Sequence, residues 1–326
     1  MLNNKKLCSI ALISIALVFM LVSITDAASY AYITNYGSNN VSVIDIATNN
    51  ITAIASANTF NNPCGVAVTP DGLNVYVTNL NGNTVSIINT TTNTVTTTMP
   101  VGNGPFGATV TPDGKRVYVT NSDDGTVSVI NTKTNTVTTT VPVGNVPFGA
   151  AVTPDGKDVY VTNSDDGTVS VINTSTNTIT ATVNVGDGPF GVAVAPDGSN
   201  VYVANDYDYP GDVSVINTKT STVTTTVPVG AGPTGVAVTP DGTKVYVANS
   251  DDDTVSVINT TTNAVTNVPV GFVPRGVTVT PDGTKVYVAN SQNNTVSVIN
   301  TIKNEVIATV PVGKWPIAFG QFIDNI

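Results

Sequence analysis

Residues Val117-Tyr118-Val119-Thr120-Asn121 decide the fold, because close copies of this stretch return along the whole chain. The copies contain Tyr32, Tyr76, Tyr118, Tyr160, Tyr202, Tyr246 and Tyr287, with spacings of 44, 42, 42, 42, 44 and 41 residues. Seven copies at so regular a period predict seven structural units.

Each unit contains four short segments rich in Val, Tyr and Thr. In the third unit they are residues 105–110, 117–121, 127–130 and a Thr-rich run that ends at Pro142. The segments have the composition of β-strands, and Pro-Asp-Gly or Asp-Asp-Gly supplies turns between them. Parallel β-solenoids repeat over much shorter coils. The pattern therefore predicts an all-β fold, a seven-bladed β-propeller with four antiparallel strands per blade.

The two ends of the chain predict how the ring closes. The first copy starts at Tyr32 without a preceding innermost strand, and the segment 315–322 follows the seventh copy. This segment aligns with the innermost strand of the other units. We therefore expect the N- and C-terminal strands to pair in the first blade, which makes residues 29–326 one closed domain.

The N-terminus resembles an export signal. Lys5 and Lys6 precede an apolar run over residues 7–24, which ends at Ala27 and Ala28. Residues 1–28 are therefore expected to be a secretory signal peptide, although the run is long enough to be a retained anchor. We therefore expect an extracellular protein, secreted or attached to the cell surface. Because no second apolar run follows, no further membrane span is expected.

Six Asn-x-Ser/Thr sequences occur, any of which could be glycosylated outside the cell. They begin at Asn40, Asn50, Asn89, Asn173, Asn259 and Asn293. A chain this rich in Asn and Thr also produces such sequences by chance. Without residues 1–28 the only cysteine is Cys64, so no intrachain disulfide is expected.

The repeats resemble those of the YVTN-type seven-bladed β-propellers of archaeal surface-layer proteins, surface antigens and some exported bacterial proteins. Six copies keep Val-Tyr-Val-Thr/Ala-Asn, and only Tyr32-Ile33-Thr34-Asn35 departs from it. The resemblance covers nearly all of residues 29–326 and implies the propeller fold. It also implies a module of the cell surface, because such propellers serve there, often beside other domains.

The chain contains no histidine, which removes the usual general base and the commonest metal ligand. Lactonases, amine dehydrogenases and haem-dependent reductases include propellers of similar shape, and their histidine-dependent members are excluded. A hydrolase that uses carboxylates is left as a third hypothesis, with Glu305 as the only glutamate. We predict a non-enzymatic protein without a cofactor.

Charge is distributed unequally over the two faces that the blades would form. The turns expected on one face, called the acidic face below, carry eleven aspartates against Arg275 and Lys314. The opposite face, called the Pro-Asp-Gly face, balances seven aspartates with eight lysines and arginines. Neither face offers the basic surface that nucleic acid requires. Ca²⁺ is a possible ligand of Asp251, Asp252 and Asp253, but a purely structural turn is favoured.

The residue between Pro and Gly of each innermost strand varies, although the residues around it recur in each unit. This position could therefore determine specificity. Phe106, Phe148 and Phe190 occupy it in three units and either fill gaps between blades or contact a ligand. Cations and aromatics that suit a sugar or a carboxylate are expected together in one quadrant, at Phe272, Arg275, Lys314 and Trp315.

These observations predict an exported, non-enzymatic propeller that acts at the cell surface as an envelope, adhesion or protein-interaction module. Its expected partners are envelope proteins or surface glycans. The alternative is a protein that binds glycans or small molecules at the mouth of the central channel.

Overall fold

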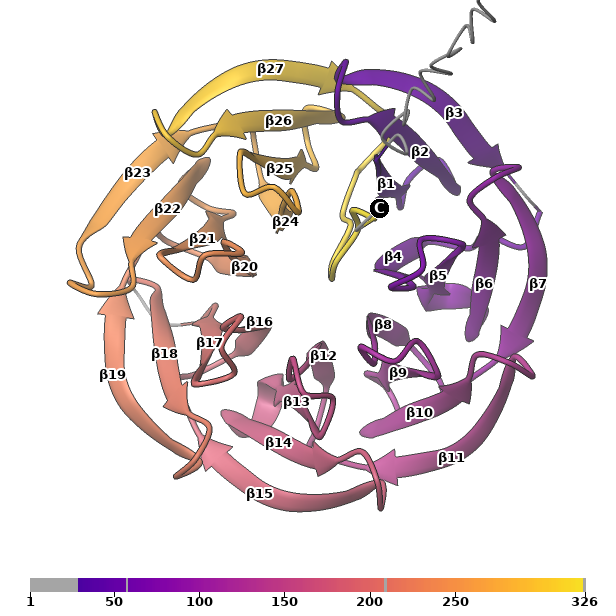
Figure 1. Ribbon diagram of the computed structural model, residues 1–326, viewed down its shortest axis with the longest axis horizontal. Coiled ribbons are helices and arrows are strands. Elements are labelled where there is room, and N and C mark those ends of the chain that lie inside the picture. The colour runs from indigo at the N-terminus through magenta and orange to yellow at the C-terminus, as the bar shows by residue number, and fades with distance from the viewer. Residues whose placement is uncertain (1–28, 57, 208–209, 325–326) are drawn as a thin grey trace, which may run out of the picture.

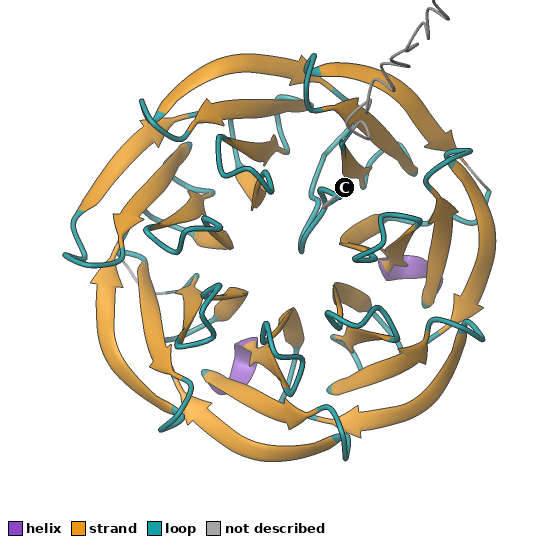
Figure 2. Cartoon of the chain, viewed as in Figure 1, coloured by secondary structure: helices purple, strands orange, loops and turns teal. Residues whose placement is uncertain are grey.

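The computed structural model describes residues 29–56, 58–207 and 210–324, which form seven β-sheets in a ring around a central channel (Figure 1, Figure 2). Each sheet is one blade, whose antiparallel strands follow one another from the channel to the rim. Six blades have four strands. The predicted all-β seven-bladed propeller is confirmed.

Blade 1 consists of β1 (Tyr30–Asn35), β2 (Asn40–Asp45) and β3 (Asn50–Ser56). Blade 2 consists of β4 (Pro63–Val68), β5 (Asn74–Asn79), β6 (Thr84–Asn89) and β7 (Thr94–Pro100). Blade 3 consists of β8 (Pro105–Val110), β9 (Arg116–Asn121), β10 (Thr126–Asn131) and β11 (Thr136–Pro142). Blade 4 consists of β12 (Pro147–Val152), β13 (Asp158–Asn163), β14 (Thr168–Asn173) and β15 (Thr178–Asn184).

Blade 5 consists of β16 (Pro189–Val194), β17 (Asn200–Asn205), β18 (Asp212–Asn217) and β19 (Thr222–Pro228). Blade 6 consists of β20 (Pro233–Val238), β21 (Lys244–Asn249), β22 (Thr254–Asn259) and β23 (Val265–Pro269). Blade 7 consists of β24 (Pro274–Val279), β25 (Lys285–Asn290), β26 (Thr295–Asn300) and β27 (Glu305–Pro311). Two short 3₁₀ turns, Leu80–Gly82 and Ser164–Asp166, are the only helices among the described residues.

The asparagine that ends each copy of the repeated motif is fully buried and organises its blade. In blade 3 the Asn121 Nδ2 donates hydrogen bonds to the Ser128 Oγ and the Thr126 Oγ1 of β10, both at 3.0 Å. A buried amide without partners would be costly, so the serine and threonine of the third strand are needed where they stand.

The motif tyrosine connects neighbouring blades. The Tyr118 hydroxyl donates to the Asn177 Oδ1, 2.8 Å away in the turn before β15 of blade 4. Asn177 has a φ of +54°, a conformation that asparagine tolerates better than most residues. Corresponding bonds join Tyr76 to Asn135, Tyr246 to Asn304 and Tyr287 to Asn49.

The C-terminal segment closes the ring differently from the expected regular strand. It pairs with β1 at its two ends, through isolated bridges of Pro316 with Asn35 and of Ile323 with Ala31. Between them Phe319 leaves β1 and makes a parallel bridge with Gly65 of β4. The sheet of blade 1 therefore has three strands, which corrects the expectation of a fourth. The bulge carries residues 319–321 into the channel.

Candidate functional site

Four phenylalanine rings lie together across the channel, and we call Phe106, Phe148, Phe190 and Phe319 the phenylalanine plug. Phe148 lies 4.8 Å from Phe106 and 4.4 Å from Phe190, measured between ring centroids. Phe319 lies 5.2 Å from Phe106 and 5.0 Å from Phe190. These are ordinary distances for packed aromatic pairs. The three phenylalanines predicted from the repeats thus pack against one another, and a contact with a ligand stays a prediction.

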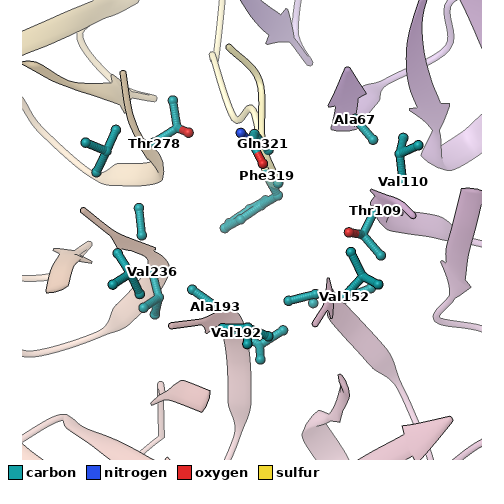
Figure 3. Close-up of a pocket in the computed structure, with 18 of the residues that line it drawn as sticks. Ala67, Thr109, Val110, Val152, Val192, Ala193, Val236, Thr278, Phe319 and Gln321 are labelled. Carbon is teal, nitrogen blue, oxygen red and sulfur yellow. The ribbon is translucent and has the colours of Figure 1, made fainter. Parts of the chain in front are cut away.

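Phe319 was missed by the sequence analysis, although a signal existed. In the C-terminal segment it stands where the innermost strands of the other units carry Val or Ala, for example Val66 and Ala108. The bulge of the segment toward β4 is what directs its ring into the channel (Figure 3).

The backbone of the plug residues is held by threonines of the second strands. The Thr120 Oγ1 accepts a hydrogen bond from the Gly107 N–H of its own blade and donates one to the Phe148 carbonyl of the next, both at 2.8 Å. A Cβ on Gly107 would lie 2.2 Å from that carbonyl oxygen, so only glycine permits the approach. Thr78 and Thr162 make the same bridge to Phe106 and Phe190.

Arg275 takes the plug position in blade 7 and is half-buried. Burial raises the pKa of the Cys64 thiol to about 12, and the charge of Arg275 opposes this shift. Burial also raises the pKa of the Asp206 carboxyl, Asp251 raises it further, and Arg275 again acts in the opposite direction. The charge of Arg275 is therefore felt by groups of blades 2 and 5, around the acidic end of the channel.

The other members of the predicted quadrant lie on the connections that enter blades 7 and 1. The side chains of Phe272 and Trp315 are 56% and 57% exposed. The Trp315 ring centroid lies 6.3 Å from that of Tyr36, and the backbone N–H of Trp315 donates to the Asn294 Oδ1 at 2.8 Å. Lys314 is exposed. A binding role for these residues stays a prediction.

Tyr207 is an exposed aromatic that the sequence analysis did not single out. It follows β17 on the acidic face and is 67% exposed. Its N–H donates to the Asp187 carbonyl, and a Cβ on Gly188 would meet its ring at 2.5 Å. The ring therefore packs against a glycine that leaves room for it.

The carboxylates of the three aspartates proposed for Ca²⁺ accept hydrogen bonds, that of Asp251 from the Ser250 hydroxyl at 3.1 Å and the other two from the connections that enter blades 6 and 7. The Asp252 Oδ2 accepts from the Ala231 N–H at 2.6 Å, and the Asp253 Oδ1 accepts from the Val273 N–H at 2.9 Å. Asp253 has a φ of +56° where blade 3 carries Gly125. In the described part of the chain, no group of three or more metal-ligating side chains is found. The structural turn stays the favoured prediction, and calcium binding stays the alternative.

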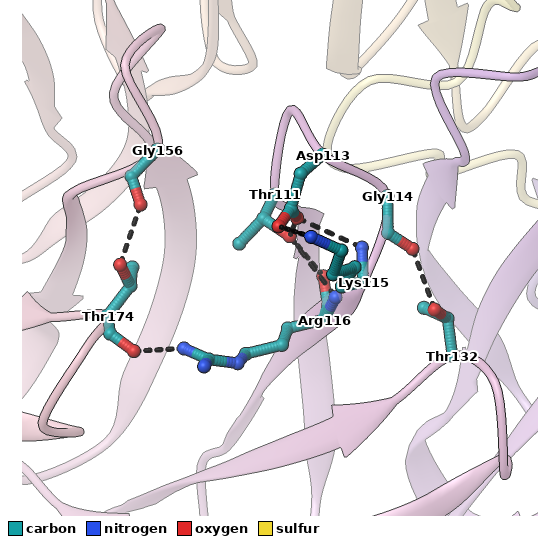
Figure 4. Close-up of polar contacts among 8 residues, drawn as sticks. All are labelled: Thr111, Asp113, Gly114, Lys115, Arg116, Thr132, Gly156 and Thr174. Carbon is teal, nitrogen blue, oxygen red and sulfur yellow. Dashed lines mark hydrogen bonds and ion pairs between the residues drawn. The ribbon is translucent and has the colours of Figure 1, made fainter.

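The Pro-Asp-Gly face is built from turns that satisfy their own charges (Figure 4). The Asp113 carboxylate accepts from the Thr111 hydroxyl at 2.7 Å and pairs with the Lys115 Nζ at 3.2 Å. The hydrogen bond from Thr111 is the largest of the effects that lower the pKa of Asp113. The Arg116 guanidinium donates to the Thr174 carbonyl of blade 4 and so joins two blades.

A cavity of about 610 Å³ occupies the channel on this side of the plug (Figure 3). We call it the channel chamber. Its wall is formed by the last residues of the innermost strands of blades 2 to 7, and Phe319, Gly320 and Gln321 reach into it. Six prolines of the Pro-Asp-Gly turns surround it: Pro70, Pro112, Pro154, Pro196, Pro240 and Pro281. Among the described residues, those that line it include no ionisable side chain.

The predicted glycosylation sites lie on the surface to different degrees. Asn50, Asn259 and Asn293 are exposed, whereas Asn40, Asn89 and Asn173 are half-buried. The predicted signal peptide lies outside the described residues. Within residues 29–56, 58–207 and 210–324 no helix is long and apolar enough to span a bilayer.

Comparisons with known proteins support a β-propeller family. Residues 179–305 match the model of the family described as lactonase, 7-bladed beta-propeller, and residues 71–158 match the YNCE-like beta-propeller model. Each match covers less than half of the chain. No curated protein matches the sequence.

Two solved structures illustrate the likeness of the fold. Hydrazine synthase of Kuenenia stuttgartiensis has a TM-score of 0.77 at 22% identity, with 83% of this chain and 92% of that chain covered. A functionally unknown protein of Desulfotomaculum acetoxidans has a TM-score of 0.76 at 18% identity, with 89% and 99% covered. At identities this low the likeness shows a shared fold alone.

Proposed function

We propose that the protein is an exported, non-enzymatic interaction module of the cell surface, of the YVTN type, which binds envelope proteins or surface glycans through its acidic face. The observation that carries this proposal is the set of three exposed aromatic rings on that face, those of Tyr207, Phe272 and Trp315. Large aromatics exposed on a rigid scaffold are typical of binding surfaces, because they bury much area at little entropic cost.

The connections that carry these rings are held in place by side chains of neighbouring turns. The side-chain Oδ1 atoms of Asn294 and Asn293 accept hydrogen bonds from the backbone N–H groups of Trp315 and Phe272, respectively. A surface with fixed loops loses less entropy on binding than a flexible one. Residues 1–28, with Lys5 and Lys6 before an apolar run, supply the reason to place this surface outside the cell.

The test has two parts. Fractionation of the source cells should place the protein in the envelope or the medium, and a cytosolic protein would overturn the proposal. In co-sedimentation with isolated envelopes, Trp315→Ala and Arg275→Ala should each weaken binding by about 1–3 kcal/mol, as interface anchors do. Leu73→Ala is the matched control, since Leu73 is an exposed apolar residue of the Pro-Asp-Gly face.

Hydrolysis is the second candidate, because the lactonase family model covers residues 179–305 and Asp206 lies within them. A carboxyl with a raised pKa near an arginine is suited to general acid or base catalysis. If the protein hydrolyses γ- or δ-lactones and Asp206→Asn abolishes the activity while Asp123→Asn does not, the non-enzymatic proposal fails.

A further inference from the structure

We propose that the channel chamber is a binding site for an uncharged, mainly apolar small molecule that enters from the Pro-Asp-Gly face. This site is independent of the acidic surface discussed above, because the phenylalanine plug lies between them. A chamber of about 610 Å³ has the size of a small-molecule site.

The chemistry of the wall indicates the class of ligand. Valines end the innermost strands around the chamber, and Val110, Val152, Val194 and Val238 are only half-buried there. Valines of the second strands, by contrast, are completely buried between blades. A ligand that covers these methyl groups would remove apolar surface from water, which is the main source of affinity in such sites.

Polar side chains are few and distributed around the wall, and they are those of Thr109, Thr153, Thr278, Thr280 and Gln321. The hydroxyls of Thr109 and Thr278 and the amide of Gln321 line the chamber, and Figure 3 shows all three around it. Each of them can form a hydrogen bond with a polar group of a ligand, such as an alcohol. The lining has no ionisable side chain to pair with a buried charge, so a charged group would be desolvated without compensation.

The entrance of the chamber carries charges of both signs. Each of the six prolines around the chamber is followed by an aspartate, and these are Asp71, Asp113, Asp155, Asp197, Asp241 and Asp282. Ion pairs join Asp113 to Lys115 and Asp155 to Lys157. The Lys244 and Lys285 ammonium groups donate instead to the carbonyls of Thr301 and Ile46 in the next blades. Because the charges of both signs offset one another here, selection against an anion such as a fatty acid rests on the uncharged wall of the chamber.

The inner end of the chamber is formed by Phe319. Its ring packs on Phe106 and Phe190, and its backbone carbonyl accepts the Val66 N–H at 2.7 Å. The ring is thus fixed by β4 and by the plug. This fixed aromatic surface gives the ligand a flat apolar contact at the bottom of the chamber.

The test measures binding of Nile red, a neutral apolar dye, to the full-length protein by its fluorescence. We expect saturable binding that 1-decanol displaces, both used below their aggregation limits. Decanoate at pH 8 should displace the dye at least tenfold less well than 1-decanol. Equal displacement by decanoate and decanol would overturn the predicted class of ligand.

Variants that fill the chamber locate the site. Ala193→Phe and Thr278→Phe, both in the wall shown in Figure 3, should raise the Kd of the dye at least tenfold. Thr182→Phe adds the same ring to the exposed outer strand β15 and should leave the Kd within twofold. Circular dichroism shows whether each variant is folded. One folded chamber variant is enough for the test. Unchanged binding in a folded chamber variant, or no saturable binding by the wild type, would overturn the proposal.

Discussion

Blades 1 to 4 and blades 5 to 7 solve the same packing problem with different side chains. In the first group the repeated motif contains threonine, whose hydroxyl joins the innermost strands of two blades. In the second group Ala204, Ala248 and Ala289 stand at this position and have no hydroxyl. In blade 6 the Thr234 hydroxyl reaches the Arg275 carbonyl instead, at 3.2 Å.

The difference follows the position of the phenylalanine plug. The carbonyls that Thr78, Thr120 and Thr162 hold belong to Phe106, Phe148 and Phe190. Where alanine replaces threonine, the next innermost strand carries Thr234 or Arg275 at the plug position, or the C-terminal Ile317. In blades 2 to 4 the threonine thus accompanies a fixed aromatic ring in the channel, whereas Thr34 of blade 1 holds the carbonyl of Cys64.

The largest expected effect concerns the C-terminal segment. The Thr34 hydroxyl of blade 1 accepts a hydrogen bond from the Ala318 N–H of this segment at 2.8 Å. Deletion of residues 315–326 exposes β1 and removes the buried Phe319, Phe322 and Ile323. Burial of three such side chains contributes about 5–9 kcal/mol, comparable to the stability of a whole domain. We expect an unfolded or aggregating protein in thermal denaturation. A truncated protein that melts within about two degrees of the full chain would contradict ring closure by this segment.

The next effect concerns Asp324, whose Oδ1 accepts the Tyr30 N–H at 2.9 Å at the same seam. Burial raises the pKa of this carboxyl from 3.8 to about 6. A raised carboxyl pKa destabilises the folded state as pH increases, because the unfolded chain releases the proton first. The difference between the pKa values of the unfolded and folded states corresponds to about 3 kcal/mol of unfolding free energy. This stability is lost as the pH rises from about 4 to about 6.

Asp324→Asn keeps the acceptor and removes the charge. The variant should melt at a higher temperature than the wild type at pH 8, and the two should converge at pH 3.5. Equal melting temperatures at both pH values would show that Asp324 ionises without penalty.

Thr120→Val tests the threonine bridge directly. The substitution keeps the shape and leaves the Gly107 N–H and the Phe148 carbonyl without their partner. We expect a loss of about 1–3 kcal/mol in chemical denaturation. The reverse change, Ala204→Thr in blade 5, should be neutral or add about 1 kcal/mol, since it offers a hydroxyl near the Thr234 carbonyl. Similar losses in both variants would mean that packing and not the bridge decides.

Tyr118→Phe removes the hydroxyl that donates to the Asn177 Oδ1 of blade 4. We expect a loss of about 1 kcal/mol in chemical denaturation. Tyr160→Phe is the matched control, because blade 5 carries Ser221 where blade 4 carries Asn177. If Tyr160→Phe lost as much stability as Tyr118→Phe, the hydrogen bond to Asn177 would not explain the loss.

The smallest effect is expected for calcium. Replacement of Asp251, Asp252 and Asp253 by Asn keeps oxygen acceptors for the Ala231 and Val273 N–H groups. The melting temperature should change by no more than about two degrees, with or without millimolar Ca²⁺. If Ca²⁺ raised the melting temperature of the wild type but not that of the variant, a metal site in blades 5 to 7 would be established.

The turns and the buried strands could be predicted from the sequence because short segments decide them. Pro-Asp-Gly predicted the turn in which Gly114 has a φ of +68°. Alternating valines around Tyr118 predicted a strand buried on both sides. The regular fourth strand in blade 1 was predicted wrongly, since Phe319 bonds with β4 instead of β1. Sequence similarity to an innermost strand does not reveal which neighbour a terminal segment will choose.

The sequence by itself determined the number of blades, the order of strands, the turns and the unequal charge of the two faces. Each depends on residues close together in the chain, whose backbone preferences and spacing act locally. Only the tertiary structure decided that Phe106, Phe148 and Phe190 meet Phe319, and that a chamber without charged side chains lies beyond them. These contacts join residues up to hundreds of positions apart, and their geometry is set by the closure of the ring around its channel.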